Sequence, residues 1–139
     1  MFSRNWRFFR EVPKGALSIS IIAGFITLLE AIIWYILPPH LEVVVGLGAA
    51  GVILSSYSLS SFLSSLPSGD LADKINRKFV FITGIIIFIL SLFLLYYNSF
   101  WSLFAFMFLL GIASTLICVG VLNAILDLGD KNFGGEAGG

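Results

Sequence analysis

The chain has 139 residues, of which 58% are hydrophobic and 12% are charged, and its formal net charge is zero. Its mean hydropathy of +1.01 lies far from the balance of a soluble domain. A bilayer core of roughly 30 Å is crossed by about 20 apolar residues of helix. The uncharged stretches from Val43 to Ser68 and from Phe79 to Leu126 both exceed that length. The composition therefore indicates an integral membrane protein and not a soluble one with a large core.

Four apolar segments predict four transmembrane helices, at about residues 15–37, 43–66, 79–95 and 101–126. Pro38 and Pro39 are expected to stop the first helix and Pro67 the second, because proline lacks the amide donor that a helix needs. The third segment is almost wholly Ile, Leu and Phe, and we expect it to face lipid. The predicted fold class is an all-α integral membrane protein.

Basic residues lie on one side of this arrangement. The loops after the first and third segments contain no Lys or Arg, whereas basic residues precede the first segment and follow the second: Arg4, Arg7, Arg10, Lys14, Lys74, Arg77 and Lys78. By the positive-inside rule, both chain ends and the charged loop face the cytoplasm. This predicts a cytoplasmic basic N-terminus at 1–14, a membrane region at 15–126 and a cytoplasmic tail at 127–139, in a multi-pass protein of the plasma membrane.

Residue types that build most catalytic and metal sites are scarce. Cys118 and His40 are the only cysteine and histidine, which argues against an internal disulfide and a histidine or cysteine metal site. No Ser–His–Asp pattern is arguable, and the terminal "FGGEAGG" lacks the lysine of a phosphate-binding loop. We therefore expect no enzyme, no metal, no cofactor and no nucleic-acid partner.

Small residues recur every three or four positions on two of the segments. Such stripes let helix backbones approach closely in lipid. The favoured interpretation is helix packing, with substrate contact as the alternative, for Gly48, Gly51, Ser55, Ser58, Ser61 and Ser65 on the second segment and Gly111, Ser114, Thr115 and Cys118 on the fourth.

Glu30 is the sharpest candidate for chemistry. It stands within the first apolar segment, where an ionised acid costs about 3 kcal/mol on insertion scales. We expect it to face a bundle or cavity together with Ser20, Gly24, Thr27, Ala31 and Trp34. The functional interpretation is proton coupling or pairing with a cationic substrate, in which Thr27 and Trp34 would take part. The alternative is a protonated acid that bonds to a neighbouring helix.

The charged loop carries a motif, "GDLADKINRK" from Gly69 to Lys78. The order G-x-L-A-D-K-x-x-R-K directly after the second segment resembles the signature of the major facilitator superfamily of secondary transporters, G-x-L-A-D-[RK]-x-G-[RK]-[RK]. Asn76 stands where the family usually has glycine, and asparagine tolerates a left-handed backbone better than most residues. Glu30 and Tyr57 also resemble residues of some proton-coupled and drug-exporting members. Met107 departs from the arginine often found in the fourth helix.

The resemblance implies a gating role for this loop. In the family it acts as a latch between two six-helix halves, so Gly69, Asp73, Lys74, Arg77 and Lys78 are the candidate gating residues. Because members resemble one another in having twelve helices, we expect this chain to be part of an N-terminal half. Its tail would then lead toward a missing fifth helix.

The expected function is alternating-access transport of a small solute, with proton coupling as a candidate feature. Expected partners are the lipid bilayer, an unidentified small-molecule substrate, and either the remaining transporter half or a second copy. Two alternatives stay open: a self-contained four-helix dimeric exporter of the small multidrug type, and a non-transporting membrane assembly or regulatory subunit.

Overall fold

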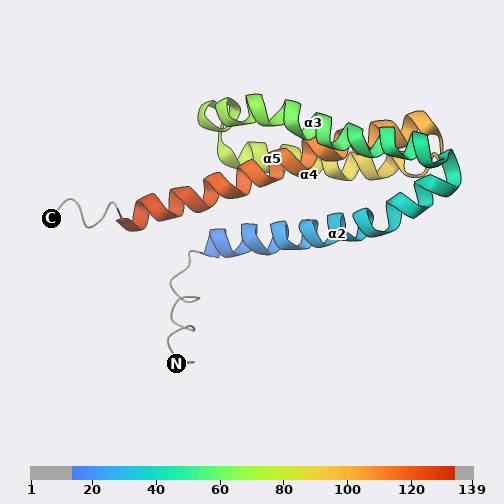
Figure 1. Cartoon of the computed structure of the whole chain (residues 1–139). Helices are drawn as coiled ribbons and strands as arrows, with labels where there is room; N and C mark the ends of the chain where they lie inside the picture. Colours follow the sequence, from blue (N-terminus) through green and yellow to red (C-terminus); the bar gives the residue numbers. More distant parts are fainter. Residues whose placement is uncertain (1–13, 134–139) are drawn as a thin grey trace.

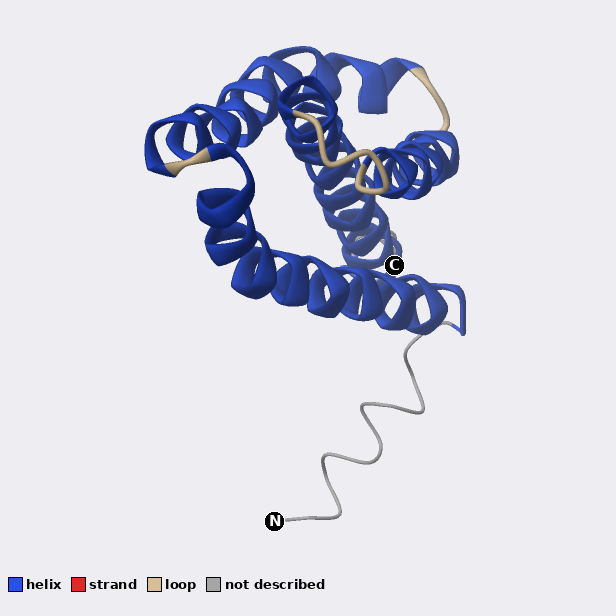
Figure 2. Ribbon diagram, turned by 90° about the vertical axis from the view of Figure 1, so that its right-hand side faces the viewer, coloured by secondary structure: helices blue, strands red, loops and turns tan. Residues whose placement is uncertain are grey.

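The computed structural model describes residues 14–133 as four α-helices joined by short loops (Figures 1 and 2). The helices are α2 (Lys14–Val45), α3 (Leu47–Lys74), α4 (Arg77–Leu94) and α5 (Phe100–Phe133). Between residues 14 and 133 there is no strand, so the all-α prediction is confirmed. Residues 1–13 and 134–139 lie outside the described part, and the predicted cytoplasmic location of both ends stays a prediction.

The helices run up and down, so that successive helices are antiparallel (Figure 1). The start of α2, the α3–α4 connection and the end of α5 lie at one end of the molecule, and the other two connections lie at the opposite end. At that opposite end His40 Nε2 lies 3.3 Å from Asn98 Oδ1, which joins the last turns of α2 to the α4–α5 loop. The basic residues Lys74 and Lys78 flank the α3–α4 connection, as the orientation argument requires.

Three helices are long and apolar enough to cross a membrane, over Leu17–Val45, Leu47–Ser68 and Phe100–Asp127. The apolar part of α4, Lys78–Leu94, is shorter. At 1.5 Å per residue, the 18 residues of α4 rise roughly 27 Å, close to the roughly 30 Å of a bilayer core. Because α3 ends and α5 begins at opposite ends of the bundle, α4 has to run from one end of the bundle to the other.

Helix α5 is the centre of the packing and has extensive contacts with both α3 and α4. Glycines permit these close approaches. A Cβ added at Gly84 would lie 2.8 Å from Ile117, and one added at Gly120 would lie 2.9 Å from Phe81. The fully buried side chains Leu103, Phe106, Met107 and Leu110 fill the interior from α5. Helix α2 packs less extensively, against α3 and α5.

Both expected proline stops are wrong as helix ends. Pro38 and Pro39 lie inside α2, which continues to Val45, and Pro67 lies inside α3, which continues to Lys74. Membrane helices tolerate proline because neighbouring groups and small local adjustments satisfy the freed carbonyls. The last turns of α2 bend toward α3 (Figure 1), as expected where two amide donors are missing. The helix instead ends at Val45, and the next residue, Gly46, has a φ of 84° that suits glycine.

Two expectations about helix faces need correction. Helix α4 does not face lipid all round, because Val80, Phe81 and Phe88 are buried against the bundle while its other face is exposed. On α3 the predicted small-residue stripe is mostly exposed, and a Cβ at Gly48 or Gly51 would meet nothing within 4 Å. Of the predicted stripe, Ser61 does pack, through its contact with Thr115, and the rest of the packed face of α3 is formed by Ile53, Ser56, Tyr57 and Ser60.

The signature segment is mostly helical. Residues 69–74 form the last turns of α3, and only Ile75 and Asn76 separate α3 from α4. Asn76 has φ −54° and ψ 122°, and its side chain accepts a hydrogen bond from the Lys78 amide at 3.3 Å. The substitution of the family glycine is therefore accommodated by an N-cap and not by a left-handed backbone.

Candidate functional site

Three polar side chains from three helices meet inside the membrane region. The hydroxyl of Tyr57 (α3) donates to Glu30 Oε1 (α2) at 2.7 Å, and the hydroxyl of Ser114 (α5) donates to Glu30 Oε2 at 3.3 Å. The Tyr57 hydroxyl also lies 3.2 Å from Ser114 Oγ. We call these three residues the Glu30 cluster. It connects α2 to the α3–α5 pair.

The ring of Trp34 positions Tyr57. Trp34 lies one helical turn after Glu30 on α2, and its ring meets the Tyr57 ring edge to face with centroids 4.9 Å apart. Such a contact is worth about 0.5–1.5 kcal/mol beyond its buried area. The tyrosine is thus fixed at its ring by Trp34 and at its hydroxyl by Glu30.

A second polar contact sets the spacing of α3 and α5 beside the cluster. Ser61 Oγ and Thr115 Oγ1 lie 2.9 Å apart, and Thr115 also donates to the Gly111 carbonyl at 3.0 Å. A Cβ added at Gly111 would contact Ser60 Oγ and would lie 2.5 Å from the Tyr57 carbonyl oxygen. Because Gly111 lacks a side chain, the α3 backbone at Tyr57 can approach α5 closely.

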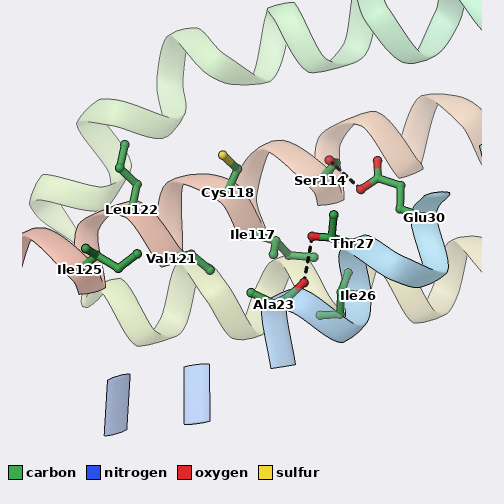
Figure 3. A pocket seen from close by; sticks show the side chains of 10 residues that line it. All are labelled: Ala23, Ile26, Thr27, Glu30, Ser114, Ile117, Cys118, Val121, Leu122 and Ile125. Carbon is green, nitrogen blue, oxygen red and sulfur yellow. Dashed lines mark hydrogen bonds between the residues drawn. The ribbon is translucent and has the colours of Figure 1, made fainter. Parts of the chain in front are cut away.

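A pocket of about 390 Å³ lies between α2 and α5, with Glu30 at its polar end (Figure 3). Its size is within the roughly 300–1,000 Å³ typical of ligand pockets. The lining is mostly apolar and consists of Ala23, Ile26, Thr27, Glu30, Ser114, Ile117, Cys118, Val121, Leu122 and Ile125. The pocket therefore places the Glu30 carboxyl group at one end of a mostly apolar lining.

The Glu30 carboxylate is stabilised by hydroxyl donors and not by a positive charge. No ion pair to Glu30 and no possible metal group of three or more His, Cys, Asp and Glu occurs among the described residues. A carboxylate at this depth costs about 3 kcal/mol on insertion scales, and two hydroxyl donors offset part of that cost.

The structure brings together the residues predicted around Glu30. Trp34 contacts the cluster through Tyr57, and Thr27 lines the pocket while its hydroxyl donates to the Ala23 carbonyl at 2.9 Å. The rest of the predicted face is wrong: Ser20, Gly24 and Ala31 are exposed, and Ala23 and Ile26 line the pocket instead.

The candidate gating residues lie where α3 ends and α4 begins. Gly69, Asp73 and Lys74 belong to the last turns of α3, and Arg77 and Lys78 begin α4. The side chains of Lys74 and Lys78 are exposed. Those of Asp73 and Arg77 lie outside the described residues, so the latch stays a prediction.

Sequence reasoning missed two members of the cluster as site residues. The sequence singles out Tyr57 for its resemblance to a family tyrosine, and Ser114 as part of a stripe interpreted as helix packing, with substrate contact as the alternative. A hydroxyl in the middle of an apolar span needs a polar partner. The signal in the sequence was therefore that Glu30, Tyr57 and Ser114 lie at a similar depth in their predicted membrane spans.

The fold and the Glu30 cluster define a multi-pass helical membrane protein with an acidic site between its helices. Residues 19–137 match the family profile described as the Major Facilitator Superfamily. The chain therefore belongs to the major facilitator superfamily, a family of transporters, and the resemblance drawn from Gly69–Lys78 is confirmed. A search of curated proteins and a search of solved structures gave no match.

Proposed function

We propose that this transporter of the major facilitator type works by alternating access and couples solute movement to protons at Glu30. The observation that carries the proposal is the Glu30 carboxylate, held by Tyr57 and Ser114 on two other helices. An ionisable residue inside a membrane span marks a transport or proton pathway by default. Because Glu30 lies on α2 and bonds to α3 and α5, its protonation is linked to the relative placement of these three helices.

Protonation would change the hydrogen bonding of the cluster. The ionised carboxylate can only accept hydrogen bonds, and it accepts one from each of the two hydroxyls. A protonated Glu30 has one proton to donate, and a cluster hydroxyl that accepts it has to turn its own proton away from Glu30. Contacts that differ between two protonation states bias the equilibrium between two conformations. Helix α2, which packs less extensively than α3 and α5, is the element that such a change moves most easily.

We further propose that the segment from Gly69 to Lys78 is the cytoplasmic latch, with Asp73, Lys74, Arg77 and Lys78 as its charged residues. Its location at the α3–α4 connection, at the same end as the start of α2, supports this role. The facing surface would come from further helices or from a second copy. In this proposal both chain ends are cytoplasmic and the protein lies in the plasma membrane.

Infrared difference spectroscopy on the protein in lipid vesicles tests the proton site. Lowering the pH should produce the carbonyl stretch of a protonated carboxylic acid in a dehydrated environment. That band should be absent in Glu30→Gln.

Glu42→Gln is the matched control, because Glu42 lies on the same helix but is exposed near its end. This variant should keep the band. Difference spectra that are the same for Glu30→Gln and the unmodified chain would rule out Glu30 as the proton site.

A further inference from the structure

The polar groups of the α2–α5 pocket have an uneven supply of donors and acceptors. Thr27 donates its only hydroxyl proton to the Ala23 carbonyl, and Ser114 donates its own to Glu30 (Figure 3). The Tyr57 hydroxyl also donates its hydrogen bond to Glu30. Cys118 contributes only a thiol, which is a weak donor. The pocket therefore presents acceptors to a ligand, and its only uncommitted donor is that thiol.

The shortage of free hydrogen-bond donors in the pocket disfavours two classes of ligand, anions and sugars. An anion needs donors or a positive charge, and no basic side chain lines the pocket. A sugar needs donors and acceptors in similar numbers, because each unpaired hydroxyl that is buried costs free energy. A ligand that donates or carries a positive charge has a partner in Glu30, whose two oxygens keep lone pairs beyond the two hydroxyl bonds.

The rest of the lining selects for an apolar body. Ile117, Val121, Leu122 and Ile125 form one wall from α5, and Ala23 and Ile26 face them from α2 (Figure 3). A strongly hydrated cation would lose its water shell here without enough replacement ligands. A cation whose charge is surrounded by apolar groups loses little hydration and buries area against both walls.

We propose that the α2–α5 pocket binds an apolar organic monocation whose charge is neutralised by Glu30. The proposal rests on the proposed function for the transport role of the site, and it adds the chemical class of the ligand. The volume of about 390 Å³ limits the buried part of that ligand to the size of a small drug molecule.

Cys118 gives a direct test, because it is the only cysteine of the chain, is exposed, and lines the pocket. The experiment measures the rate at which N-ethylmaleimide alkylates Cys118 in the detergent-solubilised full chain. The probes are tetraphenylphosphonium and tetraphenylborate, which have nearly the same shape and opposite charge. Tetraphenylphosphonium should slow alkylation, and tetraphenylborate at the same concentration should not.

Variants at Glu30 test whether its negative charge, and not only the shape of the pocket, is responsible for the protection. Glu30→Gln should raise the tetraphenylphosphonium concentration needed for half protection by roughly 10- to 100-fold, the range of a hydrogen-bonded charge contact. Glu30→Asp should retain much of the protection, which guards against a folding defect, and Glu42→Gln should match the unmodified chain.

Equal protection by both probes, protection that persists in Glu30→Gln, or no protection at all would overturn the ligand class. The proton site is judged separately by its infrared band. A band at Glu30 without cation protection would leave the proposed function standing and remove only this inference.

Discussion

At the scale of the residue, the Tyr57 hydroxyl is the group that fixes the Glu30 carboxylate. Its hydrogen bond of 2.7 Å to Oε1 is the shortest contact in the Glu30 cluster. Tyr57→Phe removes this donor and keeps the ring that packs on Trp34. Hydrogen bonds within membranes average about 0.6 kcal/mol, and bonds to charged groups reach about 1.5–3 kcal/mol. We expect Tyr57→Phe to lower the free energy of unfolding by about 1–2 kcal/mol, measured by titration with a denaturing detergent.

Tyr35→Phe is the matched control for this prediction. Tyr35 lies next to Trp34 on α2, but its side chain is 85% exposed. Its substitution should change the free energy of unfolding by no more than about 0.5 kcal/mol. Equal effects of the two variants would show that the Tyr57 hydroxyl does not stabilise the cluster.

The same residues show what a sequence can and cannot predict about a site. Glu30 was found because an acid in an apolar segment is costly and therefore conspicuous. Its partners were not found, because pairing Tyr57 and Ser114 with Glu30 requires the rotation of three helices about their own axes. That rotation is set by packing contacts distant in sequence, such as those at Gly111. The errors at Gly24 and Ala31 have the same origin.

At the scale of the element, Gly111 controls the approach of α3 to α5. A Cβ at this position would contact Ser60 Oγ and the backbone of Tyr57, and a backbone carbonyl cannot move aside as a flexible side chain can. Gly111→Ala should therefore lower the free energy of unfolding by about 1–3 kcal/mol, as overpacking in a well-packed interior does. Detergent-induced unfolding followed by circular dichroism measures this change.

Gly51→Ala distinguishes crowding from the general effect of adding a methyl group to a helical glycine. A Cβ at Gly51 would meet nothing within 4 Å, so alanine should be neutral or stabilise by up to about 1 kcal/mol. Gly111→Ala should also make Tyr57→Phe less costly in the double variant, because the displaced tyrosine has already lost its bond. Additive effects would contradict a link between Gly111 and the Glu30 cluster.

Helix existence was predictable from apolar length, whereas helix ends and faces were not. Pro38, Pro39 and Pro67 failed as stop signals because α2 and α3 continue through them. In the small-residue stripes, spacing alone could not distinguish Gly111, which is packed, from Gly48 and Gly51, which are exposed. Both kinds of glycine have helical periodicity, and only the neighbouring helix makes them different.

At the scale of the whole molecule, the arrangement of charges implies one orientation. Lys74 and Lys78 flank the α3–α4 connection, at the same end as the first residue of α2, Lys14. The α4–α5 connection at the opposite end has no charged residue. It contains the exposed aromatic residues Tyr96 and Tyr97. Basic residues are retained on the cytoplasmic side, and tyrosines are enriched at membrane interfaces. The α3–α4 connection should therefore be cytoplasmic and the α4–α5 connection external.

Cysteine labelling of intact cells tests this orientation together with the plasma-membrane location. In a Cys118→Ser background, Tyr96→Cys places a thiol at the α4–α5 connection and Ile75→Cys places one at the α3–α4 connection; both positions are exposed. A membrane-impermeant maleimide should label the Tyr96→Cys chain in intact cells, and the Ile75→Cys chain only after the cells are permeabilised. Labelling of both variants only after permeabilisation would contradict the plasma-membrane location. The reverse pattern would place the Gly69–Lys78 segment outside the cell, where it cannot act as a cytoplasmic latch.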